Sequence, residues 1–134
     1  LDIKSRGMME KAAPLQKEFL EKAKDEKKDF EIVLGLPTNI LVEEYKTFPD
    51  YQNYPALCEL AEKQTLEIGA EIWAPRWSAG FTENSILKMH NENIKVVTWT
   101  LDEPDFIKSY MERYSLDGIL SNYPSVVAYE YYTK

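Results

Sequence analysis

The side chains of this chain that could do chemistry follow predicted strands. Trp99 lies near the carboxyl end of the apolar run 94–102, and Arg76 follows a predicted strand at 70–74. In parallel α/β folds, the carboxyl ends of strands are where ligands bind, so Trp99 could wall a pocket or could be a core residue. The guanidinium of Arg76 could pair with an anionic group, or Arg76 could be an ordinary surface arginine.

The chain has one histidine, His90, and one cysteine, Cys58. A single residue of each type, far apart in the sequence, cannot build a typical structural zinc site, and one cysteine excludes an intrachain disulfide. His90 lies inside a predicted helix, between Met89 and Asn91, where we expect a solvated side chain.

The composition is that of an ordinary globular chain of 134 residues with a net charge of −7. This charge argues against a nucleic-acid surface and against electrostatic docking on anionic membranes. No apolar run approaches the length of a membrane span. An acidic chain can still bind an anionic substrate, because a local pocket can be basic or filled by a metal.

The apolar run 94–102 organises the predicted fold. Residues 96–100 form an unbroken β-branched and aromatic segment without polar alternation, which indicates a strand covered on both faces of a parallel sheet. A helix at 104–114 and a second strand at 118–121 follow, so that the three elements form one βαβ unit.

The remaining pattern predicts further strands alternating with helices, hence one domain, or part of one, with a parallel sheet and right-handed crossovers. The other expected elements are a strand end at 1–4, a helix at 8–27, a strand at 30–36, a helix at 40–46 capped at Thr38 or Asn39, an aromatic loop at 47–54, a helix at 55–68 stopped by Gly69, a helix starting at Thr82 and running to 91, and a final helix at 125–132.

The helix at 8–27 is the most clearly amphipathic of these elements. Its predicted buried stripe consists of Met9, Ala12, Leu15, Phe19 and Leu20. Pro14 is expected in the first turn, the helical position that proline tolerates.

Two motifs near the end of the chain resemble those of a known family. Residues 95–102 read KVVTWTLD and residues 116–124 read LDGILSNYP. Together they resemble the carboxyl-terminal part of glycerophosphodiester phosphodiesterases, in which a V-x-x-W-T-V-[ND] strand and one helix precede D-G-I-[IL]-[TS]-[DN]-Y-P. EIWAPR at 71–76 is similar to the preceding strand of that family, and LDIK at 1–4 to its mid-barrel L-E-I-K strand. The region 30–54 adds little to the resemblance.

The resemblance implies an α/β fold of parallel (β/α) units, namely the carboxyl-terminal half of a TIM (β/α)8 barrel. This partial barrel would span residues 1–134, and the amino-terminal half would be absent, so we expect the chain to be the later part of a longer one. Spider-venom sphingomyelinase D enzymes are relatives of the family and share the W-T-V-D and T-N-Y-P endings. Asn122, in place of the commoner aspartate, slightly favours a resemblance to these enzymes.

The resemblance also implies a site for a phosphodiester. In the family, acidic side chains hold a calcium or magnesium ion, a hard cation that prefers oxygen ligands; the metal and a lysine neutralise the phosphodiester, while a histidine pair does the acid–base or nucleophilic chemistry. Asp2 falls at the position of a metal-binding glutamate, Lys4 at that of the phosphate-facing lysine, and Trp99 at that of an aromatic wall. Asp2 is one methylene shorter than the family's glutamate, and both Asp2 and Lys4 could instead be terminal residues without a site role.

Three functions remain open at this point. The first is the carboxyl-terminal part of a metal-dependent phosphodiesterase that hydrolyses glycerophosphodiesters to glycerol 3-phosphate and an alcohol. The family's H-R-G and E-x-D motifs are absent from the chain, so catalysis and binding of the divalent metal would need the upstream half. The second is an inactive half-barrel that binds or self-associates, with the missing half or a second copy as its partner. The third is a phospholipase D of the sphingomyelinase type. No feature of the sequence indicates a compartment.

Overall fold

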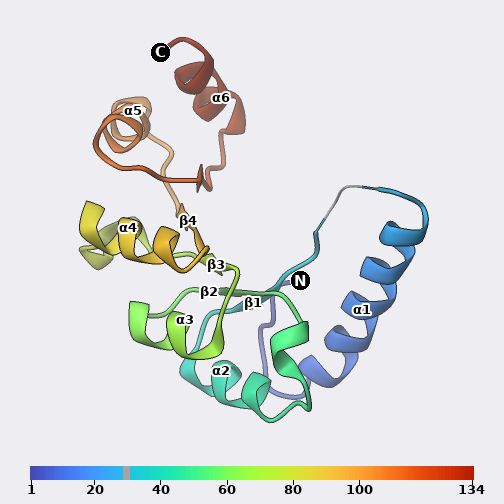
Figure 1. The fold of residues 1–134 in the computed structure, drawn as a ribbon. Helices are drawn as coiled ribbons and strands as arrows, with labels where there is room; N and C mark the ends of the chain where they lie inside the picture. Colours follow the sequence, from blue (N-terminus) through green and yellow to red (C-terminus); the bar gives the residue numbers. More distant parts are fainter. Residues whose placement is uncertain (29–30) are drawn as a thin grey trace. The chain divides into compact units, whose positions relative to one another are not determined.

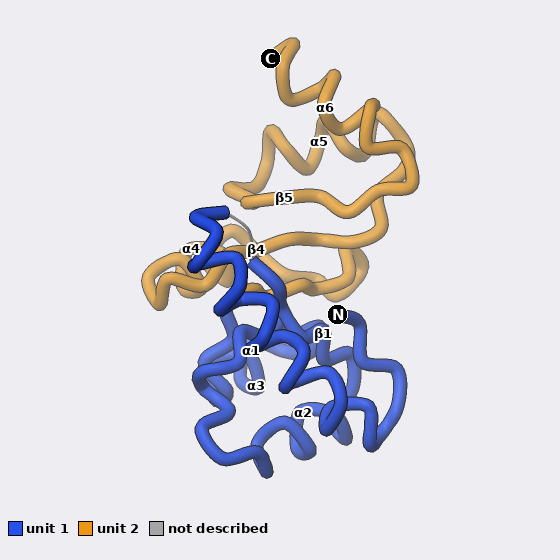
Figure 2. Tube along the Cα trace, turned by 90° about the vertical axis from the view of Figure 1, so that its right-hand side faces the viewer, with its two compact units in different colours: residues 1–71 blue, residues 72–134 orange. Residues whose placement is uncertain are grey.

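The computed structural model describes residues 1–28 and 31–134 of the chain. The chain divides into two compact units, Leu1–Glu71 and Ile72–Lys134 (Figure 2). Both contain parallel strands that alternate with helices (Figure 1), which confirms the predicted α/β class. Among the described residues, no helix is long and apolar enough to cross a membrane.

Unit 1 contains a pair of short parallel strands and three helices. Gly35 of β1 lies opposite Leu57 of β2, and Asp2 forms a parallel bridge to Gly35 from the other side. The predicted strand end at 1–4 therefore pairs as expected. The elements are α1 (Met9–Asp25), β1 (Leu34–Leu36), α2 (Asn39–Lys46), a 3₁₀ turn (Tyr51–Asn53), β2 (Ala56–Cys58) and α3 (Glu62–Ile68).

The predicted helix at 55–68 is wrong in its first half, because this stretch forms β2. The backbone of β2 finds its hydrogen-bond partners in its neighbours: Leu34 donates to the Pro55 carbonyl at 2.8 Å, and Glu71 donates to the Ala56 carbonyl at 2.9 Å. Three apolar residues can form either a strand or a turn of helix, and pairing beside β1 decides between them. The helix that follows does end at Gly69, which has a φ of 61°.

The buried face of α1 also differs from the predicted stripe. Leu15 and Phe19 are 48% and 49% exposed, whereas Gln16 is fully buried. The Gln16 amide nitrogen donates to the carbonyl oxygens of Ile32 at 2.7 Å and Pro55 at 2.8 Å. Backbone carbonyl groups away from water need donors. Gln16 points inward and supplies one to Ile32 and a second one to Pro55, besides the Leu34 N–H, while part of the apolar stripe stays exposed.

The expected position of Pro14 in the first turn of α1 was wrong as well. The helix begins at Met9, so Pro14 lies inside it and not in its first turn. Proline has no N–H group, so the carbonyl of Glu10 receives no helical hydrogen bond from this position. Elsewhere in unit 1, the predicted strand at 30–36 is present as β1, and Phe30 lies outside the described residues.

The cap of α2 and the aromatic loop that follows this helix agree with the sequence predictions. Thr38 caps α2 by accepting a hydrogen bond from the Leu41 N–H. The aromatic loop at 47–54 is present. The side chain of Tyr45, which is 2% exposed, holds it by two hydrogen bonds. The Tyr45 hydroxyl lies 2.7 Å from the Tyr51 carbonyl oxygen and 2.6 Å from that of Tyr54. Burial raises the pKa of this phenol, so it remains a donor.

Unit 2 is built around the predicted βαβ unit. Strand β4 pairs in parallel with β3 on one side, where Trp73 lies opposite Val96, and with β5 on the other, where Thr98 lies opposite Ile119. The elements are β3 (Ile72–Trp73), a 3₁₀ turn (Trp77–Ala79), α4 (Glu83–Asn91), β4 (Lys95–Thr98), α5 (Pro104–Arg113), β5 (Gly118–Ile119) and α6 (Pro124–Tyr132).

Trp73 is a core residue of unit 2. It is 3% exposed and meets Phe81 edge to face, with ring centroids 6.1 Å apart. Thr82 caps α4 in a capping box with Ser85, so the predicted start of this helix is confirmed. The last helix, α6, differs from the others because none of its residues is buried.

Candidate functional site

The carboxyl edge of unit 1 brings together Asp2, Lys4 and Glu59. Asp2, Gly35 and Leu57 lie at one level of the sheet, so Lys4 and Glu59, each two residues further along, extend past the strand ends on the same edge. Lys4 forms an ion pair with Asp2, and both side chains are largely exposed. Hydrogen bonding and charge from Asp2 raise the pKa of Lys4, which therefore remains an ammonium group.

Glu59 is the residue of this edge that sequence reasoning missed. Partial burial raises its pKa, the negative charge of Asp2 raises it further, and Lys4 acts in the opposite direction. Glu59 directly follows β2, the strand mistaken for a helix, so its position on a strand end could not be seen. A correct assignment of residues 56–58 is the signal that would have found it.

The carboxylates of this edge do not make a complete metal site by themselves. Calcium takes six to eight oxygen ligands, and magnesium is octahedral. Within residues 1–28 and 31–134, no three histidine, cysteine, aspartate or glutamate side chains gather closely enough to hold a metal. Asp2 also shares its carboxylate with Lys4. This chain could thus supply at most a part of such a site.

The carboxyl edge of unit 2 joins Arg76 to Trp99. The two residues form an isolated parallel bridge beyond the ends of β3 and β4, and the Trp99 carbonyl accepts a hydrogen bond from the Trp77 N–H at 3.0 Å. The indole nitrogen of Trp99 donates to the Ala74 carbonyl at 2.8 Å, which fixes the ring. Trp99 is half-buried. Part of its side chain packs inside unit 2, and the rest is open to solvent and could line a pocket.

Arg76 presents its guanidinium above this ring. Its central carbon lies 5.9 Å from the Trp99 ring centroid, within the range of a cation–π contact. In the part of the chain that the structure describes, no carboxylate forms an ion pair with Arg76, and its side chain is exposed. The guanidinium therefore keeps free N–H donors for an anion.

Asp102 and Asn122 form a second contact at this edge. One carboxylate oxygen of Asp102 accepts hydrogen bonds from the Asn122 N–H at 2.8 Å and the Ser121 hydroxyl at 3.0 Å, and the other accepts from the Asn122 amide at 2.9 Å. These donors lower the pKa of Asp102, with the Asn122 side chain as the first cause. The pair links the loops that follow β4 and β5.

We expected His90 to be a freely solvated helix residue, but its side chain contacts Asp117. Its Nε2 lies 2.8 Å from a carboxylate oxygen of Asp117, which also accepts the Val96 N–H at 2.6 Å. Asp117 immediately precedes β5, so this contact lies at the amino edge of the strands. Within unit 2, His90 is thus at the opposite edge of the sheet from Arg76 and Trp99.

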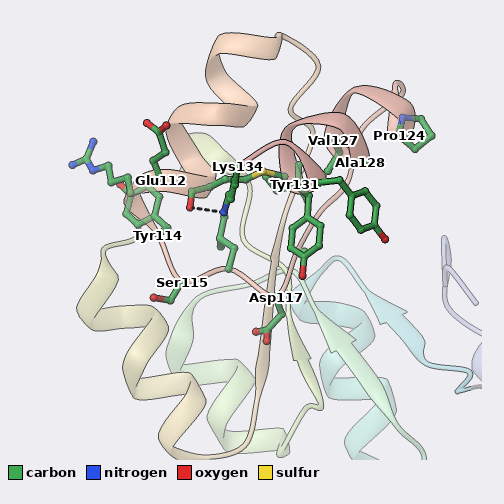
Figure 3. A pocket seen from close by; sticks show the side chains of 15 residues that line it. Glu112, Tyr114, Ser115, Asp117, Pro124, Val127, Ala128, Tyr131 and Lys134 are labelled. Atoms are coloured by element: carbon green, nitrogen blue, oxygen red, sulfur yellow. Dashed lines mark hydrogen bonds between the residues drawn. The ribbon is translucent and has the colours of Figure 1, made fainter.

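A pocket of about 610 Å³ lies next to Asp117 and apart from the residues at the carboxyl edges. It is enclosed by the end of α5, by β5 and by α6, and includes Tyr114, Tyr131 and Lys134 (Figure 3). Lys134 crosses it to within 3.5 Å of the Met111 carbonyl oxygen. None of the four predicted site residues lines this pocket, so its volume is not evidence for the phosphodiester site.

The structure thus brings the predicted residues together in two pairs, Asp2 with Lys4 in unit 1 and Arg76 with Trp99 in unit 2. Each pair lies at a carboxyl edge of parallel strands, the usual position of ligands in such folds. The arrangement defines a parallel α/β protein with basic and aromatic side chains at the ends of its strands.

Two solved structures have this fold over almost the whole chain. A protein from Silicibacter pomeroyi assigned as a glycerophosphoryl diester phosphodiesterase matches 99% of the chain with 21% identity and a TM-score of 0.66. A glycerophosphodiester phosphodiesterase from Parabacteroides distasonis matches 98% with 12% identity and a TM-score of 0.60. The chain spans 49% and 56% of these two proteins, about half of their length.

No family model matches the chain, and no curated protein matches it. The structural matches confirm the resemblance found in the sequence at the level of the fold. The chain has the α/β fold of half of a TIM-barrel glycerophosphodiester phosphodiesterase. Which half it represents is predicted by its terminal motifs.

Proposed function

We propose that this chain is the carboxyl-terminal part of a metal-dependent phosphodiesterase that hydrolyses glycerophosphodiesters to glycerol 3-phosphate and an alcohol. The main support is that nearly the entire chain matches half of two glycerophosphodiester phosphodiesterase structures. Basic and aromatic side chains at the carboxyl ends of the strands fit a phosphodiester, because an anion needs cationic donors and a wall that excludes water.

Each predicted residue receives a role in this proposal. In unit 1, Lys4 supplies a compact ammonium that neutralises an anionic oxygen. In unit 2, Arg76 supplies N–H donors for an anionic group. Trp99 walls the substrate. Asp2 contributes one carboxylate to a calcium or magnesium ion, whose other ligands come from outside the described residues.

The proton transfers require catalytic groups other than those that the described residues place at these two edges. His90 is engaged by Asp117 at the amino edge of unit 2, and sequence reasoning assigns the catalytic histidines to the upstream half of the barrel. The chain therefore binds and orients the substrate, and the hydrolytic step needs the complementary part.

The test is release of glycerol 3-phosphate from glycerophosphodiesters by the longest natural polypeptide that contains this chain. We expect activity with calcium or magnesium and loss of activity on chelation. Lys4→Met and Arg76→Met should each lower kcat/KM by at least about tenfold, the size of one charge-assisted hydrogen bond. Lys11→Met removes an exposed lysine of α1 and should have no effect.

Activity that persists after exhaustive chelation would contradict the metal requirement. Cleavage of sphingomyelin with release of choline, without formation of glycerol 3-phosphate, would favour the sphingomyelinase-type alternative. Equal losses in Lys4→Met and Lys11→Met would remove Lys4 from the site.

A second candidate function, a self-associating module, is favoured by α6. This helix, PSVVAYEYY, contains one charged residue, and none of its residues is buried. Tyr129 and Tyr132 are 64% and 82% exposed. A helix that is apolar all round is normally covered. Here the proposed cover is a second copy of the chain.

Sedimentation analysis at micromolar concentration tests this alternative. A dimer is expected, and Tyr129→Ser combined with Tyr132→Ser should weaken it by at least about tenfold, because two large aromatic surfaces are lost. Leu87→Ser, which changes an exposed apolar residue of α4, is the control. A monomer at these concentrations would reject the module.

A further inference from the structure

Two exposed aromatic rings face each other at the carboxyl edge of unit 2. Trp77 is 38% and Phe106 52% exposed, and their ring centroids lie 6.1 Å apart with the planes tilted by 38°. Trp77 belongs to the turn after β3, and Phe106 to the first turn of α5. Two large rings held open to solvent at a strand-end edge offer π faces to a ligand.

The rings line a small pocket with an acidic side. Its volume is about 200 Å³, and Thr100, Leu101, Asp102 and Glu103 complete it. Asp102 is ionised, because Ser121 and Asn122 donate three hydrogen bonds to its carboxylate and lower its pKa. Glu103 is exposed. The described lining contains two aromatic rings, two carboxylates and no basic side chain.

This composition selects one kind of ligand. A quaternary ammonium group has no N–H donor, so it cannot satisfy a hydrogen-bonding site, but its diffuse positive charge is attracted to aromatic faces and nearby carboxylates. The amino terminus of α5 would favour an anion, but Glu103, its cap residue, and Asp102 place negative charge there.

We propose that the Trp77–Phe106 pocket binds a quaternary ammonium headgroup. This inference rests on the proposed function for its second half, that the headgroup belongs to the phosphodiester substrate. Arg76 directly precedes Trp77 and carries its free guanidinium on the Trp99 ring. Consecutive residues thus serve a phosphate and a trimethylammonium group, as in a phosphodiester of a choline-type alcohol.

The first experiment needs no catalysis. Tetramethylammonium chloride is titrated into the ¹⁵N-labelled chain, and the indole N–H signals of its three tryptophans are followed by NMR. We expect a saturable shift of the Trp77 signal with a millimolar dissociation constant, and no saturable shift with ammonium chloride at equal ionic strength. Phe106→Leu should weaken binding by at least about threefold, the lower end of a cation–π contribution. Glu103→Gln removes a nearby negative charge and should weaken binding by a similar factor.

Matched controls change the same residue types elsewhere. Phe19→Leu alters a ring of similar exposure on α1, and Glu92→Gln an exposed carboxylate after α4; neither should affect binding. Trp77→Phe keeps a ring in place and should weaken binding without loss of the fold. A response to ammonium equal to that to tetramethylammonium, or equal weakening by Phe19→Leu and Phe106→Leu, would overturn the proposal.

Activity then separates this proposal from the proposed function. In the longest polypeptide that contains the chain, Phe106→Leu should reduce the preference for glycerophosphocholine over glycerophosphoethanolamine by at least about threefold, matching the loss in binding. Tetramethylammonium binding without phosphodiesterase activity would overturn the proposed function and keep the pocket. Phosphodiesterase activity without tetramethylammonium binding would overturn the proposed pocket and keep the proposed function.

Discussion

Lys4 is the positive charge between two carboxylates of unit 1. It pairs with Asp2 and lowers the pKa of Glu59, against the opposing effects of burial and of Asp2. Both partners of the Asp2–Lys4 pair are exposed, so the pair contributes little to stability. Its main effect is on the protonation of the carboxylates at the carboxyl edge of unit 1.

Replacing Lys4 with Met should raise the pKa of Glu59 further above its ordinary value. The substitution removes the one cause that lowers this pKa and leaves burial and Asp2 unopposed. Titration of the carboxyl carbons by NMR measures the change directly. Lys11→Met, which changes an exposed lysine on α1, should leave the pKa of Glu59 where it is, and a similar rise in both variants would contradict the assignment.

Asp102 should stabilise unit 2 in a pH-dependent way. Its folded pKa lies below the ordinary value of 3.8, so the unfolded state binds the proton more tightly and stability falls as pH drops from about 4 through the folded pKa. Asp102→Asn should lower the melting temperature at pH 7, and the difference should shrink toward pH 2 to 3 as the wild-type carboxylate is protonated. A difference that is independent of pH would reject this account.

At the scale of elements, α4 is held at both of its ends. Glu83 in its first turn accepts hydrogen bonds from the Ser115 N–H at 3.0 Å and hydroxyl at 2.5 Å, and His90 in its last turn contacts Asp117. Glu83 and His90 are seven residues apart, two helical turns, so they share one face. That face fixes the loop between α5 and β5.

The cap of α4 gives a sharp test of local structure. Thr82→Ala removes the side chain that accepts the Ser85 N–H and should cost about 1 kcal/mol in the free energy of unfolding, the usual value of an N-cap. Thr82→Ser retains the hydroxyl and should restore nearly all of it. Urea unfolding measures both variants, and an equal cost for Ser and Ala would exclude capping as the cause.

Gln16 tests the corrected face of α1. Gln16→Leu has a similar size but removes the side-chain donor to the Ile32 carbonyl and one of the two donors to the Pro55 carbonyl, so a loss of about 1–3 kcal/mol is expected on urea unfolding. Leu15→Gln, next to it on the exposed side, should change stability by less than about 0.5 kcal/mol. A stabilised Gln16→Leu variant would show that the two carbonyls find other partners.

These elements also show what the sequence could predict. Caps and stops such as Thr38, Gly69 and Thr82 act through neighbouring backbone groups, so their residue types were sufficient. Residues 56–58 and the inward turn of Gln16 depend on strands far away in the sequence. The pairs at the strand ends follow from the βα order, whereas Glu59 and the Trp77–Phe106 pocket required the three-dimensional arrangement.

At the scale of the whole molecule, the two compact units carry different parts of the proposed chemistry. Unit 1 holds Asp2, Lys4 and Glu59. Unit 2 holds Arg76, Trp99 and the Trp77–Phe106 pocket with its carboxylates. The resemblance predicted the fold because its motifs lie on strands, the part of a barrel least free to vary. The proposed headgroup pocket lies beyond the strand ends, where a family motif contains the least information.

The tryptophans give the molecule a built-in optical label. All three, Trp73, Trp77 and Trp99, belong to unit 2, and none to unit 1. Tryptophan emission therefore reports the melting of residues 72–134 alone, while far-UV circular dichroism reports both units. Coincident curves in a single urea titration would establish one cooperative transition; separated curves would show that the halves of this chain melt as independent folding units.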